Sequence, residues 1–79
     1  MSPTVFRYKN YRFFFFSREE KRRHIHVSSA DGEAKFWLEP KISLAYHYRL
    51  TDKHLKELQE IVEEYKNEIN KAWQKHFKS

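Results

Sequence analysis

The chain has 79 residues, no cysteine and a formal net charge of +5 at neutral pH. This length allows one domain with a small hydrophobic core, and the lack of cysteine excludes disulfide frameworks and zinc–thiolate sites. The longest apolar run, residues 13–16, is far shorter than a membrane-spanning helix. Because no apolar run follows a basic start, the sequence predicts no signal peptide and a cytoplasmic protein without a membrane partner.

Two strands are predicted at residues 4–8 and 11–17, since β-branched and aromatic residues fill both segments. Lys9 and Asn10 supply a two-residue turn between them. The resulting cross-strand pairs are Tyr8–Tyr11, Arg7–Arg12, Phe6–Phe13 and Val5–Phe14. One face of this hairpin is uncharged and is the better core face. The other face carries Val5, Arg7, Arg12, Phe14 and Phe16.

A second hairpin is predicted from strands at residues 24–29 and 33–39. Asp31-Gly32 is a strong turn signal, with the single glycine of the chain at a position of positive φ. This turn predicts the pairs Ser28–Lys35, His26–Trp37 and Ile25–Leu38. The core face then carries Ile25, Val27, Ala34, Phe36 and Leu38, and the opposite face carries His24, His26, Lys35, Trp37 and Glu39.

Residues 42–48 fit either a fifth, edge strand or an irregular crossing segment. A helix is predicted over residues 52–77, with Thr51 as the N-cap and apolar residues at a 3.6-residue period. A helix of this length spans roughly 39 Å, whereas a short strand spans about 17–20 Å. Trp73 and Phe77 would then extend beyond the sheet. A second copy of the chain, or residues 42–50 folded back, would cover them, unless the helix simply curves over the sheet.

The expected fold is therefore α+β, with a small antiparallel sheet of four or five strands packed against one long C-terminal helix. The positive charge is concentrated in residues 1–28, which contain seven Lys or Arg and two acids, whereas residues 29–79 contain nine of each. A basic patch confined to one part of a small domain favours a polyanionic partner. Ordinary solubility is the alternative explanation.

Several segments resemble a bacterial family known as domain of unknown function 4160. The similar segments are Pro3-Thr4-Val5, Tyr11 to Ser17, His24 to Val27, Asp31 to Pro40, and Ala72-Trp73 with Phe77. The chain departs from the family at Arg23, where proline is usual, and in its more basic loop at residues 21–23. The family has no established activity, so the resemblance does not imply a particular reaction. It implies a component of a bacterial toxin–antitoxin pair, encoded beside another small protein.

The first functional hypothesis is RNA binding by the sheet face that points away from the predicted core. Aromatic rings can stack on bases, while Lys and Arg hold phosphates. The expected binding residues are Arg7, Arg12, Phe14, Phe16, Arg22, Arg23 and Trp37. If the RNA is cleaved, His24 or His26 would act as general acid or base, and Lys35 would stabilise charge on the phosphate. This is a metal-free ribonuclease arrangement, and the pattern leaves open whether any bond is cleaved.

The second hypothesis is a protein interface, because aromatic and arginine residues are also the preferred hot-spot types. A small acidic protein would neutralise the basic segment and cover Phe14, Phe16 and Trp37. A non-enzymatic adaptor that dimerises through Trp73 and Phe77 is the remaining alternative.

A third hypothesis is a metal site at His24, His26 and Glu39. Two histidines on an alternating strand are common by chance, so the preferred reading assigns no metal and no cofactor.

Overall fold

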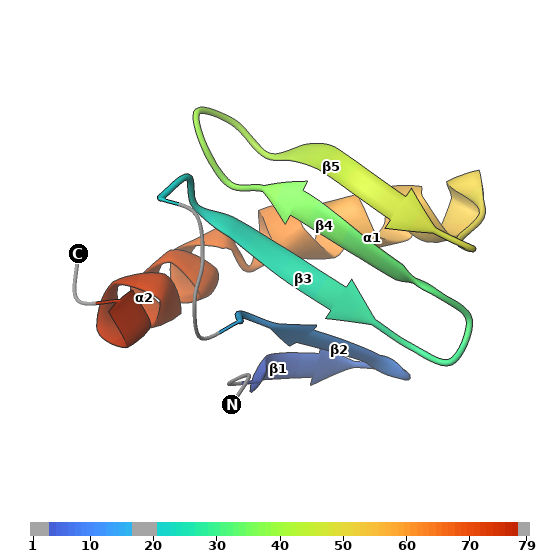
Figure 1. Ribbon diagram of the computed structural model, residues 1–79, viewed down its shortest axis with the longest axis horizontal. Helices are drawn as coiled ribbons and strands as arrows, with labels where there is room; N and C mark the ends of the chain where they lie inside the picture. The colour runs from blue at the N-terminus through green and yellow to red at the C-terminus, as the bar shows by residue number, and fades with distance from the viewer. Residues whose placement is uncertain (1–3, 17–20, 78–79) are drawn as a thin grey trace.

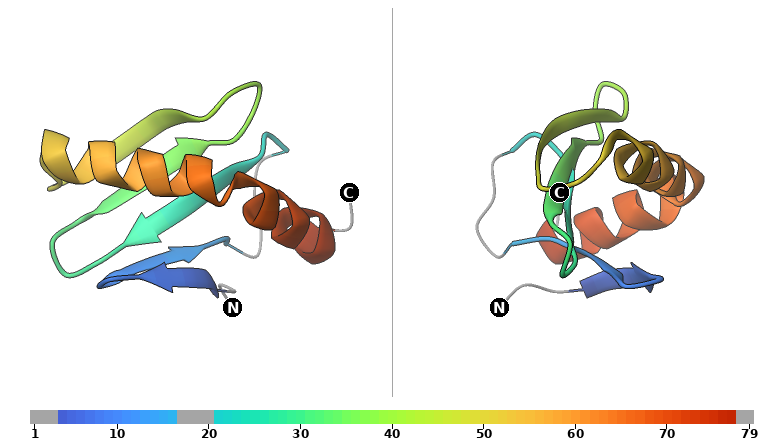
Figure 2. Two further views of the ribbon diagram at one scale, coloured as in Figure 1. Left: turned by 180° about the vertical axis from the view of Figure 1, so that it is seen from behind. Right: turned by 90° about the vertical axis from the view of Figure 1, so that its right-hand side faces the viewer.

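A computed structural model describes residues 4–16 and 21–77 of the chain. Five antiparallel strands form one sheet in the order β1-β2-β3-β4-β5, followed by two helices (Figure 1). Their bounds are β1 Thr4–Tyr8, β2 Tyr11–Phe14, β3 His24–Ser28, β4 Glu33–Trp37, β5 Ser43–Tyr48, α1 Asp52–Glu64 and α2 Lys66–Phe77. Helix α1 crosses one face of the sheet and α2 continues from it, so the opposite face carries no helix (Figure 2). The α+β class is confirmed, and so is the fifth strand.

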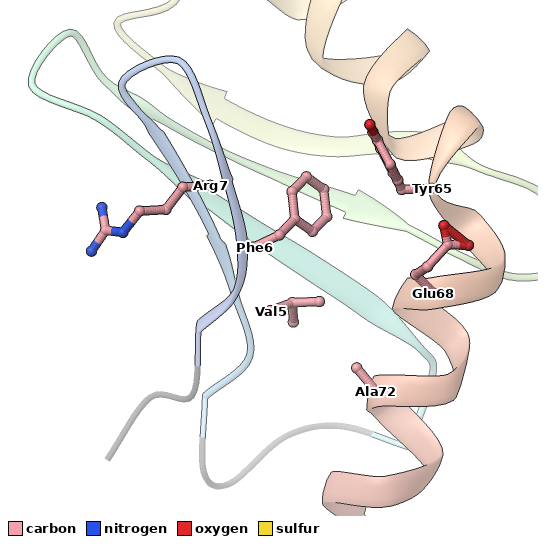
Figure 3. Close-up of a pocket in the computed structure, with 6 residues that line it drawn as sticks. All are labelled: Val5, Phe6, Arg7, Tyr65, Glu68 and Ala72. Atoms are coloured by element: carbon pink, nitrogen blue, oxygen red, sulfur yellow. The ribbon is translucent and has the colours of Figure 1, made fainter.

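The first hairpin has the predicted register beside its turn. Its pairs there are Phe6–Phe13, Arg7–Arg12 and Tyr8–Tyr11. The register then shifts, so that Phe14 pairs with Thr4 and not with Val5. A bulge of this kind places an extra residue in one strand. Here it turns both Val5 and Phe6 toward the helices (Figure 3), so the prediction that Val5 lies on the face with Arg7 is wrong. Strand β2 ends at Phe14, and Ser17, the predicted last residue, lies outside the described residues.

The second hairpin closes one residue earlier than predicted. Ser29 N donates to Gly32 O at 2.9 Å, so Ala30 and Asp31 form the turn. The pairs are therefore His24–Trp37, Ile25–Phe36, His26–Lys35, Val27–Ala34 and Ser28–Glu33. The predicted register was wrong by two residues, but the predicted faces hold because side chains alternate with a period of two.

Gly32 does not adopt the positive φ that the turn prediction required. It is needed for a different reason, because the C-terminal end of β5 passes directly over it. A Cβ at this position would meet the carbonyl oxygen of Tyr48 at 2.2 Å. Close approach of a second backbone is a common reason for glycine within a sheet, and here it sets how tightly β5 lies against the β3–β4 turn.

Residues 42–48, which the sequence left ambiguous, form the edge strand β5 beside β4. The register shifts between Lys35 and Phe36, which pair with Tyr46 and Leu44 respectively. Tyr46 consequently lies beside Lys35 on the helix-free face. The edge strand thus extends that face by one more strand.

The predicted single helix is in fact two, because α1 ends at Glu64 and α2 begins at Lys66. The N-cap prediction is confirmed: Thr51 Oγ1 accepts from His54 N at 3.2 Å. Tyr65, between the helices, has φ −103° and ψ 18°, and its ring lies 5.1 Å from that of Phe6. A straight helix of this length would leave the short sheet, whereas the break lets α2 stay against it.

This break also removes the predicted overhang. Trp73 is only 3% exposed, and its ring packs 5.2 Å from Phe15 and 4.2 Å from Phe77. Phe77 is half-buried against the same cluster. Neither a second copy of the chain nor residues 42–50 is needed to cover Trp73, because Phe15 covers it within the same chain.

An ion pair fastens the β1–β2 turn to α1. Lys9, at φ 54°, places its Nζ 2.7 Å from Glu57 Oε2, and Tyr8 OH donates to the same oxygen at 3.2 Å. The hydrogen bond from Lys9 lowers the pKa of Glu57, and the same bond raises the pKa of Lys9. Burial raises the pKa of the neighbouring Tyr11.

Replacing Glu57 with Gln should lower the free energy of unfolding more at about pH 7 than at about pH 3. Folding lowers the pKa of Glu57, so its contribution is complete above the unfolded value of 4.5 and is lost as the pH falls through the folded value. Urea unfolding at both pH values measures the difference. Glu60→Gln, an exposed acid on the same helix, should show no comparable loss. A Glu57→Gln loss of equal size at both pH values would contradict the assignment.

Candidate functional site

The helix-free side of the sheet gathers residues from four strands into one row. Phe14 of β2 pairs with His26 of β3, which pairs with Lys35 of β4, which pairs with Tyr46 of β5. Arg12 of β2 and Trp37 of β4 lie next to this row on the same side of the sheet. We call these six residues the open face: Arg12, Phe14, His26, Lys35, Trp37 and Tyr46. Five of them were predicted from strand alternation to share this side.

Cations on the open face lie over aromatic rings. The guanidinium of Arg12 is 4.5 Å from the ring centroid of Phe14, and Lys35 Nζ is 4.4 Å from that of Trp37. Arg22, which precedes β3, places its guanidinium 4.1 Å from the same Trp37 ring. A cation over a ring is stabilised by about 0.5–1 kcal/mol at an exposed site. The rings of Phe14 and Trp37 therefore hold three positive charges in defined positions.

Hydrogen bonds also fix the positions of both arginines in this set of cations. Arg12 Nε donates to Thr4 Oγ1 at 2.6 Å, and Arg22 Nε donates to the carbonyl oxygen of Glu39 at 3.0 Å. Arg7 pairs with Arg12 across the first hairpin, is exposed, and points away from the helices (Figure 3). Like charges on facing positions are normally unfavourable, and a bound anion would relieve this repulsion.

Arg23 does not join the open face, contrary to the prediction. Its Nη1 donates to Asn70 Oδ1 of α2 at 3.2 Å, and its backbone N donates to Glu39 Oε2 at 3.1 Å. The guanidinium of Arg23 therefore ties the start of β3 to the second helix.

The two histidines are buried, which corrects their prediction as accessible strand residues. His24 has no exposed surface, and its Nδ1 lies 2.7 Å from the carbonyl oxygen of Arg22. Its ring contacts Trp37 and Trp73, because α2 reaches the end of β3 and covers it. His26 is 7% exposed and lies against Phe14 and Phe16. His24 thus contributes to packing and cannot touch a bound substrate.

Glu39, the third ligand of the hypothetical metal site, does not lie opposite His24. His24 pairs with Trp37 and not with Glu39, whose carboxylate instead accepts a hydrogen bond from the backbone of Arg23. Within residues 4–16 and 21–77, no group of three His, Cys, Asp or Glu side chains is placed to hold a metal ion.

Two exposed tyrosines of β5 were missed by the sequence analysis. Tyr46 is 47% exposed and Tyr48 is 61% exposed, and both lie on the open-face side, opposite Lys35 and Glu33. Phe16, predicted correctly, is also exposed and contacts the rings of Phe14 and His26. The alternation of Tyr46 and Tyr48 was a usable signal once residues 43–48 are treated as a strand, whereas the register shift turns Leu44, which pairs with the core residue Phe36, to the helix side.

A separate pocket of about 430 Å³ lies between β1 and the junction of the helices. Val5, Phe6, Tyr65 and Ala72 give it an apolar lining, with Arg7 and Glu68 at its rim (Figure 3). It lies on the helix side of the sheet and contains none of the open-face residues. It is therefore not part of the same site.

No helix in the described part of the chain is both long and apolar enough to cross a membrane. No curated protein and no solved structure shows significant similarity to the sequence. A family model, described as Domain of unknown function (DUF4160), matches residues 10–74. This match covers most of the chain, including β2 to β5, α1 and the greater part of α2. The chain therefore belongs to the DUF4160 family.

Proposed function

We propose that the protein binds single-stranded RNA through the open face. The observation that carries this proposal is the set of cations held over aromatic rings on a helix-free sheet, next to the exposed tyrosines of β5. Single-stranded RNA offers phosphates for the cations and unstacked bases for the rings.

In this proposal the cations contact the phosphates of the RNA, and the exposed aromatic rings contact its bases. The rings of Phe14 and Trp37 are covered by cations, so they position charge and do not stack on bases. Phe16, Tyr46 and Tyr48 have exposed surface and are available for stacking. Stacking of a base on an aromatic side chain contributes about 1–3 kcal/mol. Binding should therefore depend on both salt concentration and base stacking.

The proposal places the protein as a toxin-like, RNA-binding component of a bacterial toxin–antitoxin pair in the cytoplasm. The family resemblance supports this role. The proposed function does not include cleavage of the RNA. Acid–base catalysis by two histidines would need His24, which is buried behind Trp37 and Trp73. His26 and Lys35, which pair across β3 and β4, are the remaining groups, and their place in the open face is explained by binding alone.

The experiment that tests the proposal is a titration of ¹⁵N-labelled protein with a single-stranded RNA oligonucleotide, followed by NMR. We expect the amide signals of Phe14, His26, Lys35 and Tyr46 to shift, and those on the solvent side of α2 to remain in place. Poly-glutamate of equal charge is the matched probe, because it has the negative charges without the bases. Equal or tighter binding of poly-glutamate at the same residues would instead make the open face an interface for an acidic protein.

A further inference from the structure

The outer edge of β5 is a second exposed feature, distinct from the open face. β5 pairs with β4 on one side, and no described strand lies on its other side (Figure 1). Three of the four large hydrophobic side chains exposed in the described part of the chain belong to this strand: Leu44, Tyr46 and Tyr48. An exposed strand edge presents backbone N–H and C=O groups that can pair with another extended chain.

The charges within the segment that contains β5 have one sign. From Pro40 to Thr51 the sequence contains no acid. Lys41 and Arg49 flank the strand at its two ends, and both are exposed. They are eight residues apart in the sequence, and each lies just outside the regular strand, Arg49 with a φ of 64°. A complementary strand would carry its own acids at about the same separation.

We propose that β5 binds an extended segment of an acidic partner protein as a sixth strand of the sheet. Backbone hydrogen bonds to the β5 edge would supply affinity, and contacts with the exposed Leu44, which lies on the side of the strand away from the open face, would supply specificity, as in other cases of β-strand addition. Acidic residues at both ends of the segment would pair with Lys41 and Arg49. This goes beyond RNA binding, because it uses the backbone edge of one strand and not the side-chain face of the sheet.

A second copy of the chain fits this edge less well. Two copies related by a twofold axis would pair their β5 strands antiparallel. Pairing centred on the strand would then bring Lys41 of each copy close to Arg49 of the other. Like charges at facing positions destabilise a strand pair, whereas acids at those positions stabilise it. The charge pattern therefore selects an acidic partner.

The test uses two capped nine-residue peptides of alternating valine and threonine, one with glutamates at both ends and one with lysines. Each is titrated into the full-length ¹⁵N-labelled protein. We expect the glutamate peptide to shift the amide signals of residues 43–48, and the lysine peptide to bind about tenfold more weakly or not at all. In the variant Lys41→Glu/Arg49→Glu the preference should reverse. The control Lys53→Glu/Lys56→Glu, at two exposed lysines of α1, should keep the preference of the wild type.

Three outcomes would overturn the proposal. The first is that neither peptide shifts the signals of residues 43–48 at millimolar concentration. The second is that the shifts occur on β2 and β3, which would place the peptide on the open face. The third is that the β5 signals move with protein concentration alone, which would make a second copy the occupant. The spectra of both charge-reversal variants show directly whether each is folded.

Discussion

Replacing Gly32 with Ala is expected to destabilise the protein by about 2–3 kcal/mol or more. The added Cβ would lie 2.2 Å from the carbonyl oxygen of Tyr48 and 3.0 Å from the carbonyl carbon of Arg49. Both are backbone atoms, so no side-chain rotation can relieve the contact. The end of β5 must move away from the β3–β4 turn. Urea unfolding followed by circular dichroism measures the loss.

The matched control for this prediction is Ala30→Ser, which also adds one heavy atom to the same loop, but at an exposed position. It should change the free energy of unfolding by less than about 0.5 kcal/mol. Because β5 carries Tyr46 and Tyr48, a Gly32→Ala protein that remains folded should also bind RNA more weakly. Wild-type stability in Gly32→Ala would show that β5 does not depend on this close approach.

Replacing Arg12, Arg22 and Lys35 together with Gln is expected to weaken RNA binding by on the order of 100-fold at low salt. In the proposed complex each of these cations contacts a phosphate, and each contact to a single strand contributes about 0.7 to the salt dependence. The triple substitution should therefore reduce the slope of log affinity against log salt by about two. Glutamine retains part of the side-chain stem over Phe14 and Trp37, which limits the loss of packing. Fluorescence anisotropy with a labelled RNA measures both quantities.

Strand alternation in the sequence predicts most of the open face. It placed Arg12, Phe14, His26, Lys35 and Trp37 on one side of the sheet. The turn of the second hairpin was misplaced, yet the faces were correct. The error in register was two residues, and side chains repeat their direction every two residues. A register error of two residues therefore leaves each side chain on the correct side of the sheet. It changes only which residue it pairs with on the neighbouring strand.

The burial of the histidines could not be predicted in the same way. Alternation states which side of a strand a residue is on, but not what covers that side. His24 is covered by Trp73, which reaches it only because the helix is broken at Tyr65. Neither proline nor glycine marks that break, and the apolar period continues through both helices. The break depends on tertiary packing, including the contact of Tyr65 with Phe6.

Two further features depended on contacts that are distant in sequence. Tyr46 and Tyr48 could be assigned to the open face only after residues 43–48 were known to pair with β4. Arg23 was expected to be a binding residue together with Arg22, but its guanidinium donates to Asn70 of α2. This contact joins residues 47 positions apart, so the local sequence did not indicate it.

The most direct test of RNA binding by the open face compares two variants of equal net charge in one anisotropy titration. One is Arg12→Gln/Arg22→Gln/Lys35→Gln. The other is Lys53→Gln/Lys56→Gln/Lys66→Gln, at exposed positions of α1 and α2. Binding through the open face predicts that the first variant loses affinity by on the order of 100-fold, while the second stays within a few-fold of the wild type. Equal losses in both variants, or no binding of single-stranded RNA by the wild type, would contradict it.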